Sequence, residues 1–87
     1  MAQVIENAKG FKVIEMSLPE SVKAFGGVGV CDSCNRAAYT AYYIAVLNEA
    51  FCPYCYEEWK KYATRYEEDA EIEQHNFDVA KNMLHVR

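Results

Sequence analysis

The sequence contains no long apolar segment and no low-complexity tract. Its longest nearly charge-free apolar stretch, residues 37–48, is about half of the roughly 20 residues that a membrane-spanning helix requires. The N-terminal MAQVIENAKG lacks the cationic start and apolar run of a signal peptide. We therefore expect a cytoplasmic protein that makes no membrane contact. A composition of 52% apolar and 25% charged residues also argues against intrinsic disorder.

Basic residues are few. There are 9 Lys and Arg against 13 Asp and Glu, which gives a net charge of -4 at pH 7. Contacts to nucleic-acid phosphates need clustered Lys and Arg, so we expect this chain to bind nucleic acid poorly. An acidic surface instead favours basic partners.

The chain of 87 residues is short for a self-sufficient core. A domain of this size buries only about 60–65% of the surface that its unfolded chain exposes. Such small domains gain stability from disulfides, a metal ion or a partner subunit. We expect a single domain over residues 1–87 that depends on one of these.

Four cysteines form two pairs, Cys31-Asp-Ser-Cys34 and Cys52-Pro-Tyr-Cys55, separated by seventeen residues. Without an export signal the cysteines should stay reduced, where metal ligation is favoured over disulfides. In a tetrahedral site the Zn–S distance is about 2.3 Å and the sulfurs lie roughly 3.8 Å apart, which a tight turn with a two-residue spacer allows. Seventeen residues suffice for a hairpin that returns one pair to the other. We predict that all four cysteines bind one Zn²⁺, which makes the net charge about -6.

Turn residues and β-prone residues predict two hairpins. The first has strands over residues 4–6 and 11–16, with Asn and Gly at the two ends of the connection. The second lies between the cysteine pairs. It has a strand over residues 38–46, a turn at 47–49 and a return over 50–52.

Capping residues and apolar periodicity predict three helices. Ser17 three residues ahead of Glu20, with proline in the first turn, is the capping-box pattern of a short helix that ends before two glycines. A second helix should begin at the second cysteine pair, with an inward face of Tyr56, Trp59, Ala63 and Tyr66. Asp69 caps a last helix, whose apolar stripe is Ile72, Asn76, Val79 and Met83, widened by Ala80 and Leu84.

A zinc knuckle, a hairpin and a second cysteine pair at a helix N-terminus resemble the treble-clef zinc fingers, which include LIM-type and GATA-type modules. The pattern is also similar to zinc ribbons, which place the second pair on a hairpin, but the amphipathic run after Cys55 favours the treble clef. The resemblance covers residues 28–66 and implies only that the four cysteines are ligands. The sequence departs from many members in lacking Gly after Cys34, and it has no basic base-reading patch of the GATA type.

These features together predict a small α+β zinc domain. Residues 1–27 should form the N-terminal hairpin and short helix. Residues 28–66 should form a treble-clef-like zinc module of knuckle, β-hairpin and helix, and residues 69–86 a C-terminal helix.

Two other uses of the cysteines compete with zinc. Four thiolates also hold a rubredoxin-type iron, but the cysteines of a rubredoxin knuckle are normally followed by a small residue, whereas Cys55 is followed by Tyr56. The CPYC pair is identical to the dithiol motif of glutaredoxins, which would make the chain a thiol redox protein. A thioredoxin-like fold also needs a later cis-proline, and no proline follows Pro53. Zinc is therefore favoured.

A closed four-cysteine site leaves no open coordination position, so we expect no catalytic residue and no enzyme. The module should act by protein–protein contact, as an adaptor or inhibitor of a larger partner or by self-association. A short hairpin in so small a chain should not have both faces buried. Its aromatic residues are therefore the predicted partner contacts: Tyr39, Tyr42 and Tyr43. The stripe on the last helix is the second predicted contact surface.

The alternative function is a nucleic-acid-binding zinc finger. It would use Arg36, Lys60, Lys61 and Arg65 together with stacking tyrosines. A basic patch on one face would support it, whereas dispersed charge would not. We expect the two histidines, His75 and His85, to be surface residues, because four cysteines already saturate zinc.

Overall fold

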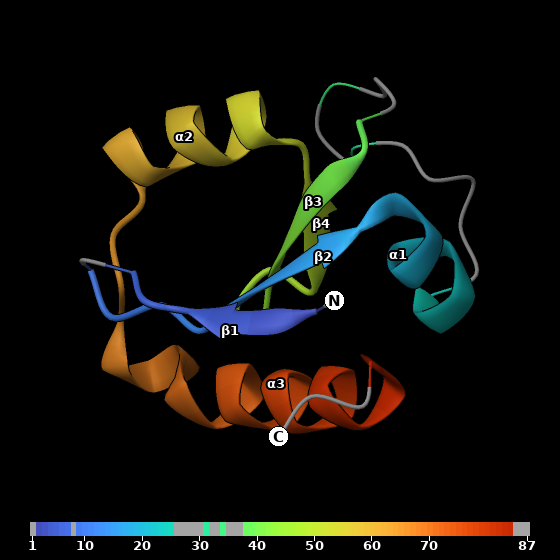
Figure 1. The fold of residues 1–87 in the computed structure, drawn as a ribbon. Coiled ribbons are helices and arrows are strands. Elements are labelled where there is room, and N and C mark those ends of the chain that lie inside the picture. The colour runs from blue at the N-terminus through green and yellow to red at the C-terminus, as the bar shows by residue number, and fades with distance from the viewer. Residues whose placement is uncertain (1, 8, 26–30, 32–33, 35–37, 85–87) are drawn as a thin grey trace.

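A computed structural model of the chain describes residues 2–7, 9–25, 31, 34 and 38–84. Over these residues the fold contains four strands, three α-helices and one 3-10 turn (Figure 1). The elements are β1 (Gln3–Ile5), β2 (Val13–Ser17), α1 (Leu18–Phe25), β3 (Thr40–Ile44), β4 (Glu49–Phe51), α2 (Pro53–Tyr62), η1 (Glu67–Asp69) and α3 (Ala70–Leu84).

The four strands form one antiparallel sheet in the order β1-β2-β3-β4. Both predicted hairpins are present, as the β1–β2 and β3–β4 pairs. The sequence did not predict that β2 also pairs with β3, where Ile14 lies opposite Tyr43. This pairing joins the N-terminal hairpin to the hairpin between the cysteine pairs, so that β2 becomes a central strand.

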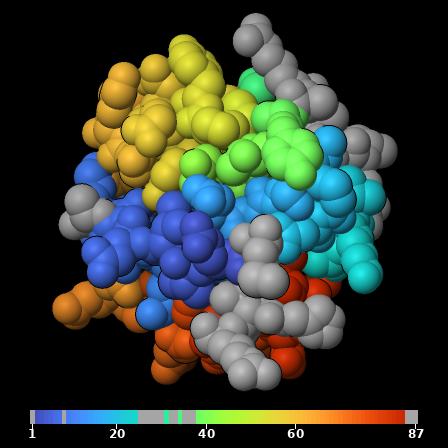
Figure 2. Space-filling model, in the orientation of Figure 1, coloured from blue at the N-terminus to red at the C-terminus, as the bar shows by residue number. Residues whose placement is uncertain are grey.

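Helices cover both faces of the sheet. In Figure 1, α2 lies on one side of the strands and α3 on the other. Successive strand residues point to opposite faces, so Val13 and Ile44 pack in the core beneath α2, while Ile14 and Tyr43 pack in the core beside α3. The expectation that the second hairpin would keep one face uncovered is therefore wrong. Figure 2 shows how β1, β2 and α2 contribute to one face of the molecular surface.

The turn between β1 and β2 depends on two residues at its ends. The Asn7 side chain accepts a hydrogen bond from the amide of Lys9 at 2.8 Å, and its carbonyl accepts one from the amide of Gly10 at 2.9 Å. Gly10 has φ +86, a left-handed conformation in which glycine has no Cβ penalty. The turn chemistry that the sequence predicts is therefore present.

The capping box at the start of α1 is confirmed. The Ser17 amide donates to Oε1 of Glu20 at 2.9 Å, and the Glu20 amide donates to the Ser17 hydroxyl oxygen at 3.4 Å. The Glu20 carboxylate also accepts from the amide of Ala2 at 2.6 Å. The backbone hydrogen bond from Ser17 is the main cause that lowers the pKa of Glu20.

The cap gives a prediction for Glu20→Gln. The lowered pKa means that the folded state favours the carboxylate. Its stabilising contribution is present at neutral pH and lost as pH falls through that pKa. Glu20→Gln keeps a side-chain oxygen that can accept from the Ser17 amide but removes the charge, so we expect it to reduce the free energy of unfolding at pH 7 by about 0.5 kcal/mol. Urea denaturation measures it, with the exposed Glu49→Gln on β4 as control; equal midpoints for the two variants would contradict the capping role.

Two helices differ from their sequence-based descriptions. α2 ends at Tyr62, so Tyr66 lies beyond the helix and is exposed rather than inward-facing. On α3 the buried positions are Glu73, Phe77 and Ala80.

The predicted apolar stripe of α3 lies on the surface, as a contact surface must, whereas Ala80 and Leu84, which were expected to widen it, pack against the sheet. Ile72, Val79 and Met83 are exposed, and Asn76 uses its side-chain amide to donate to the carbonyl of Ala45 at 2.9 Å. The physical reason is that Phe77 and Ala80 fill the space beside the sheet while Glu73 finds polar partners there. The residues at 85–87, which include the end of the predicted helix over 69–86, lie outside the described residues.

Candidate metal centre

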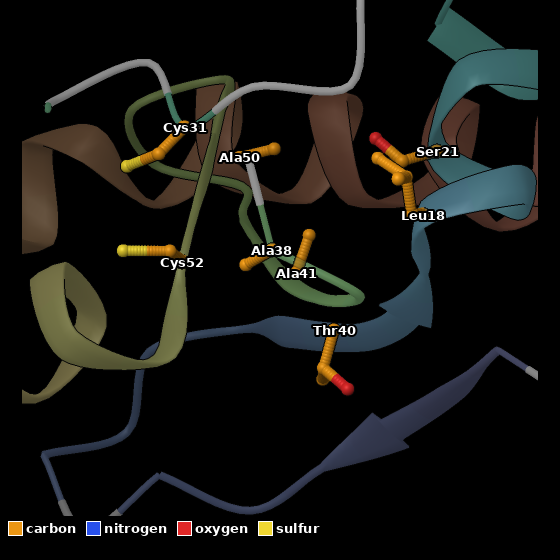
Figure 3. A pocket seen from close by; sticks show the side chains of 8 residues that line it. All are labelled: Leu18, Ser21, Cys31, Ala38, Thr40, Ala41, Ala50 and Cys52. Carbon is orange, nitrogen blue, oxygen red and sulfur yellow. The ribbon is translucent and has the colours of Figure 1, made fainter. Parts of the chain in front are cut away.

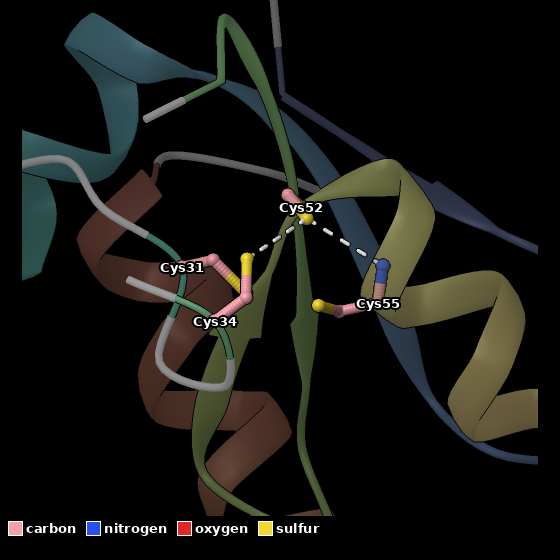
Figure 4. Close-up of side chains that lie close together, drawn as sticks. All are labelled: Cys31, Cys34, Cys52 and Cys55. Carbon is pink, nitrogen blue, oxygen red and sulfur yellow. Dashed lines mark hydrogen bonds between the residues drawn. The ribbon is translucent and has the colours of Figure 1, made fainter. Parts of the chain in front are cut away.

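The four cysteines converge on one point at the end of the β3–β4 hairpin (Figure 4). Cys31 and Cys34 precede β3, Cys52 follows β4, and Cys55 lies in the first turn of α2. Their four sulfur atoms all lie within 4.8 Å of one another. The hairpin thus returns the second pair to the first, as the spacing predicts.

The sulfur geometry fits a tetrahedral metal. The Sγ atoms of Cys34 and Cys52 are 3.7 Å apart. This separation is close to the roughly 3.8 Å expected between thiolates that share one ion at about 2.3 Å. Four soft sulfur donors suit zinc or iron and not magnesium or calcium, which prefer oxygen. The donor set therefore fits a four-cysteine metal site.

The start of α2 positions the second pair. Cys52 is the N-cap residue, with an extended backbone, and Pro53 follows it in the first turn. The amide of Cys55 donates to the Cys52 sulfur at 3.5 Å, and the amide of Tyr56 donates to the Cys52 carbonyl at 2.9 Å. The N-terminus of α2 and the Cys55 amide face the Cys52 sulfur, so this amide can support the sulfur as a metal ligand.

The site is part of the hydrophobic core beneath α2. Cys31, Cys52 and Cys55 are buried, and Cys34 is partly buried. The buried residues packed with them come from both hairpins and α2: Phe11, Val13, Ile44, Phe51 and Tyr56. A metal held here would connect the sheet to α2 directly.

A small pocket adjoins the cysteines (Figure 3). It is lined by Leu18, Ser21, Cys31, Ala38, Thr40, Ala41, Ala50 and Cys52. Its volume of about 10 Å³ is comparable with that of a single water molecule. A pocket of this size does not admit an organic substrate.

The three tyrosines proposed as partner contacts lie in three different environments. Tyr43 is only 3% exposed, and its hydroxyl donates to the side-chain oxygen of Asn48 at 2.6 Å. Tyr42 is partly buried and stacks on Tyr56, with ring centroids 4.5 Å apart. Burial raises the pKa of both Tyr42 and Tyr43. Tyr39 is 72% exposed, so it alone of the three offers an open ring surface.

The basic residues named for nucleic-acid binding are dispersed among acidic partners. Each of the three that the structure describes forms an ion pair, measured from its side-chain nitrogen to a carboxylate oxygen. The distances are 3.0 Å for Lys60 and Glu57, 3.4 Å for Lys61 and Glu58, and 2.9 Å for Arg65 and Glu73. Arg36 and His85 lie outside the described residues, and His75 is exposed on α3, as expected. Lys60 and Lys61 also line one pocket with Lys9, but Glu6 and Glu57 lie there too, so acidic residues offset the positive charge that the nucleic-acid alternative requires.

Sequence reasoning missed two features. One is the buried carboxylate of Glu73. The other is an open groove of 420 Å³ along α2, lined by Phe51, Tyr54, Cys55, Glu58, Trp59 and Tyr62. Tyr54, Glu58 and Tyr62 recur every four residues on one face of the helix, a signal that was present in the sequence but was outweighed by the stripe through Tyr56.

Across the described parts of the chain, no helix is long and apolar enough to span a membrane. The site itself is a cluster of four cysteines in an α+β fold with a four-stranded antiparallel sheet. Comparisons with models of protein families, with curated proteins and with solved structures found no match for this chain.

Proposed function

We propose that this chain is a non-enzymatic zinc protein whose four-cysteine site holds together a protein-interaction module. The observation that carries the proposal is the convergence of four cysteine sulfurs within 4.8 Å. The order of a first cysteine pair, a hairpin and a second pair at the N-terminus of α2 supports a treble-clef-like description of this module.

A structural role for the metal is supported by where the cysteines lie. Three of the four are buried in the core that joins both hairpins to α2. Structural zinc sites have apparent binding free energies of about 10–16 kcal/mol, which is comparable with the whole stability of a small domain. Zinc binding would therefore supply much of the stabilising free energy that the core of so small a chain does not provide.

Zinc is favoured over iron and over redox chemistry. Closed four-cysteine sites with one ion most often hold zinc. The bulky Tyr56 after Cys55 is buried and stacks on Tyr42, which is unlike the small residue that follows a rubredoxin cysteine. A dithiol function for Cys52 and Cys55 would give no role to the two cysteines that lie against them.

A non-catalytic role is supported by the closed site. Four cysteines supply all the ligands of a tetrahedral ion, so no position is left for water or substrate. The adjoining pocket is the size of a water molecule, and its described lining has no histidine or carboxylate to act as a base.

Cobalt substitution tests the proposal. Reconstitution of the reduced chain with Co²⁺ should give the strong thiolate charge-transfer absorption and visible bands of a tetrahedral site, and one equivalent of Zn²⁺ should remove them. Cys34→Ser should weaken the charge-transfer band, whereas Tyr39→Ala should leave it unchanged. A spectrum of octahedral, oxygen-ligated Co²⁺ would contradict the four-cysteine site. Ferric–thiolate absorption in the purified chain would show that the site holds iron and not zinc.

A further inference from the structure

The groove along α2, defined above by its six lining residues, presents exposed aromatic side chains next to a metal ligand. Tyr54 is 70% exposed and Tyr62 is 81% exposed. They lie eight residues apart on one helix, which separates them by about 12 Å along its axis. Phe51 and Cys55 are buried and form the base of the groove. Large aromatic rings held open in this way are typical of binding sites.

The inner wall of the groove packs against the core. Trp59 is half-buried and contacts Phe11, with ring centroids 4.7 Å apart, and stacks on Tyr56 at 6.1 Å. Both partners belong to the core that contains the cysteines. A ligand that packs on Trp59 therefore meets a surface that is already ordered, which lowers the entropic cost of binding.

The charge in the groove selects the class of ligand. Glu58 is the one charged side chain among the described residues that line it. Its Oε2 atom lies 3.4 Å from Nζ of Lys61. Solvent-exposed ion pairs of this kind contribute little to stability. An arginine from a ligand forms a stronger bidentate contact with a carboxylate, and tyrosine faces attract the same cation. Glu58 and the net charge of -4 instead repel phosphate.

The size of the groove selects the shape of the ligand. A volume of 420 Å³ is in the range of a small-ligand pocket, so it admits a few side chains rather than the whole face of a helix. Proline-rich extended segments bind aromatic grooves at low entropic cost because their backbone is already restricted.

We infer that the α2 groove binds an extended segment of a partner protein in which proline or another compact apolar residue lies beside arginine or lysine. The inference deepens the proposed function and rests on it, because Cys55 is both a groove residue and a metal ligand. The segment lies along α2, so that successive apolar side chains pack on Tyr54, Trp59 and Tyr62 and the cation pairs with Glu58.

Selection from a display library of short random peptides on the zinc-loaded chain tests the inference. The enriched peptides should combine proline or aliphatic residues with arginine or lysine. Fluorescence anisotropy then measures the affinity of the most enriched peptide. Tyr62→Ala and Tyr54→Ala should each weaken it by about tenfold or more, as for anchor residues of an interface. The matched control Tyr66→Ala, an exposed tyrosine beyond the end of α2 and outside the groove lining, should leave it unchanged.

A charge exchange isolates Glu58. Glu58→Lys should weaken the selected peptide, and replacing the peptide's arginine or lysine by glutamate should restore binding to this variant but not to the wild type. Binding that is insensitive to Tyr62→Ala and Glu58→Lys, or a library that yields no enrichment over the uncoated support, would overturn the inference. If oligothymidine binds more tightly than the peptides and Tyr62→Ala weakens its binding, the ligand of the groove is single-stranded nucleic acid and not a peptide.

The metal content and melting curve of each variant keep the two proposals apart. A folded, zinc-loaded chain that selects no peptide overturns the groove alone. A folded chain that contains no metal overturns the proposed function, whatever the peptides show.

Discussion

Cys52→Ser is expected to abolish tight zinc binding and to unfold the β3–β4 hairpin and α2. Loss of one of four ligands removes much of a binding free energy of about 10–16 kcal/mol, against a total stability of about 5–15 kcal/mol for a small protein. Serine is itself a good helix N-cap, so it can replace the Cys52 sulfur as acceptor for the Cys55 amide. The unfolding of this variant would therefore result from the loss of the metal and not from the loss of the helix cap. Far-UV circular dichroism and denaturant titration measure it.

Chelation of the wild type should reproduce the same loss, and added zinc should reverse it. Tyr39→Ala serves as the control, because Tyr39 is exposed and lies outside the cysteine cluster. If Cys52→Ser unfolds cooperatively at the wild-type midpoint, with and without chelator, the metal does not hold this fold together.

Glu73→Ala should reduce the free energy of unfolding by about 3 kcal/mol, the lower end of the range for breaking a buried ion pair. Glu73 is 1% exposed, and its carboxylate accepts hydrogen bonds from Arg65 at 2.9 Å and from the amide of Lys12 at 3.0 Å. Removing it leaves that amide without its carboxylate acceptor and Arg65 without its counter-charge. Arg65 is partly exposed, so water recovers part of the loss.

Two controls separate the charge from the packing. Glu73→Gln retains an acceptor for the Lys12 amide and should cost less than Glu73→Ala. Glu71→Ala, at an exposed position of the same helix, should change stability by less than about 0.5 kcal/mol. Urea denaturation compares the three variants. If Glu73→Ala and Glu71→Ala have the same midpoint, the buried pair does not stabilise the docking of α3.

Features that depend on neighbouring residues were predictable from the sequence. The turn at Asn7 and Gly10 and the Ser17–Glu20 capping box each involve residues within three positions of one another, and each is present as expected. The cysteine cluster was predictable for a related reason. Two short spacers and one hairpin-length separation leave few ways to place four sulfurs other than together.

Features that depend on distant partners were not predictable. The pairing of Ile14 with Tyr43 joins two hairpins that are each complete by local criteria. The burial of Glu73 on α3 was not predicted because hydrophobic periodicity places a glutamate outside; among the described residues, Arg65 and the Lys12 amide make its burial favourable. The inward face of α2 was predicted correctly at Tyr56, Trp59 and Ala63, which pack in the core, but the exposed tyrosines on another face were not noted.

Metal analysis with a thiol count tests the central claim most directly. Elemental analysis and native mass spectrometry of the purified chain should find one zinc ion per chain. The four cysteines should react slowly with a thiol reagent until a chelator is added, and should then all react. A metal-free chain that melts cooperatively with a native circular dichroism spectrum, or one whose cysteines are joined in disulfides, would contradict the account.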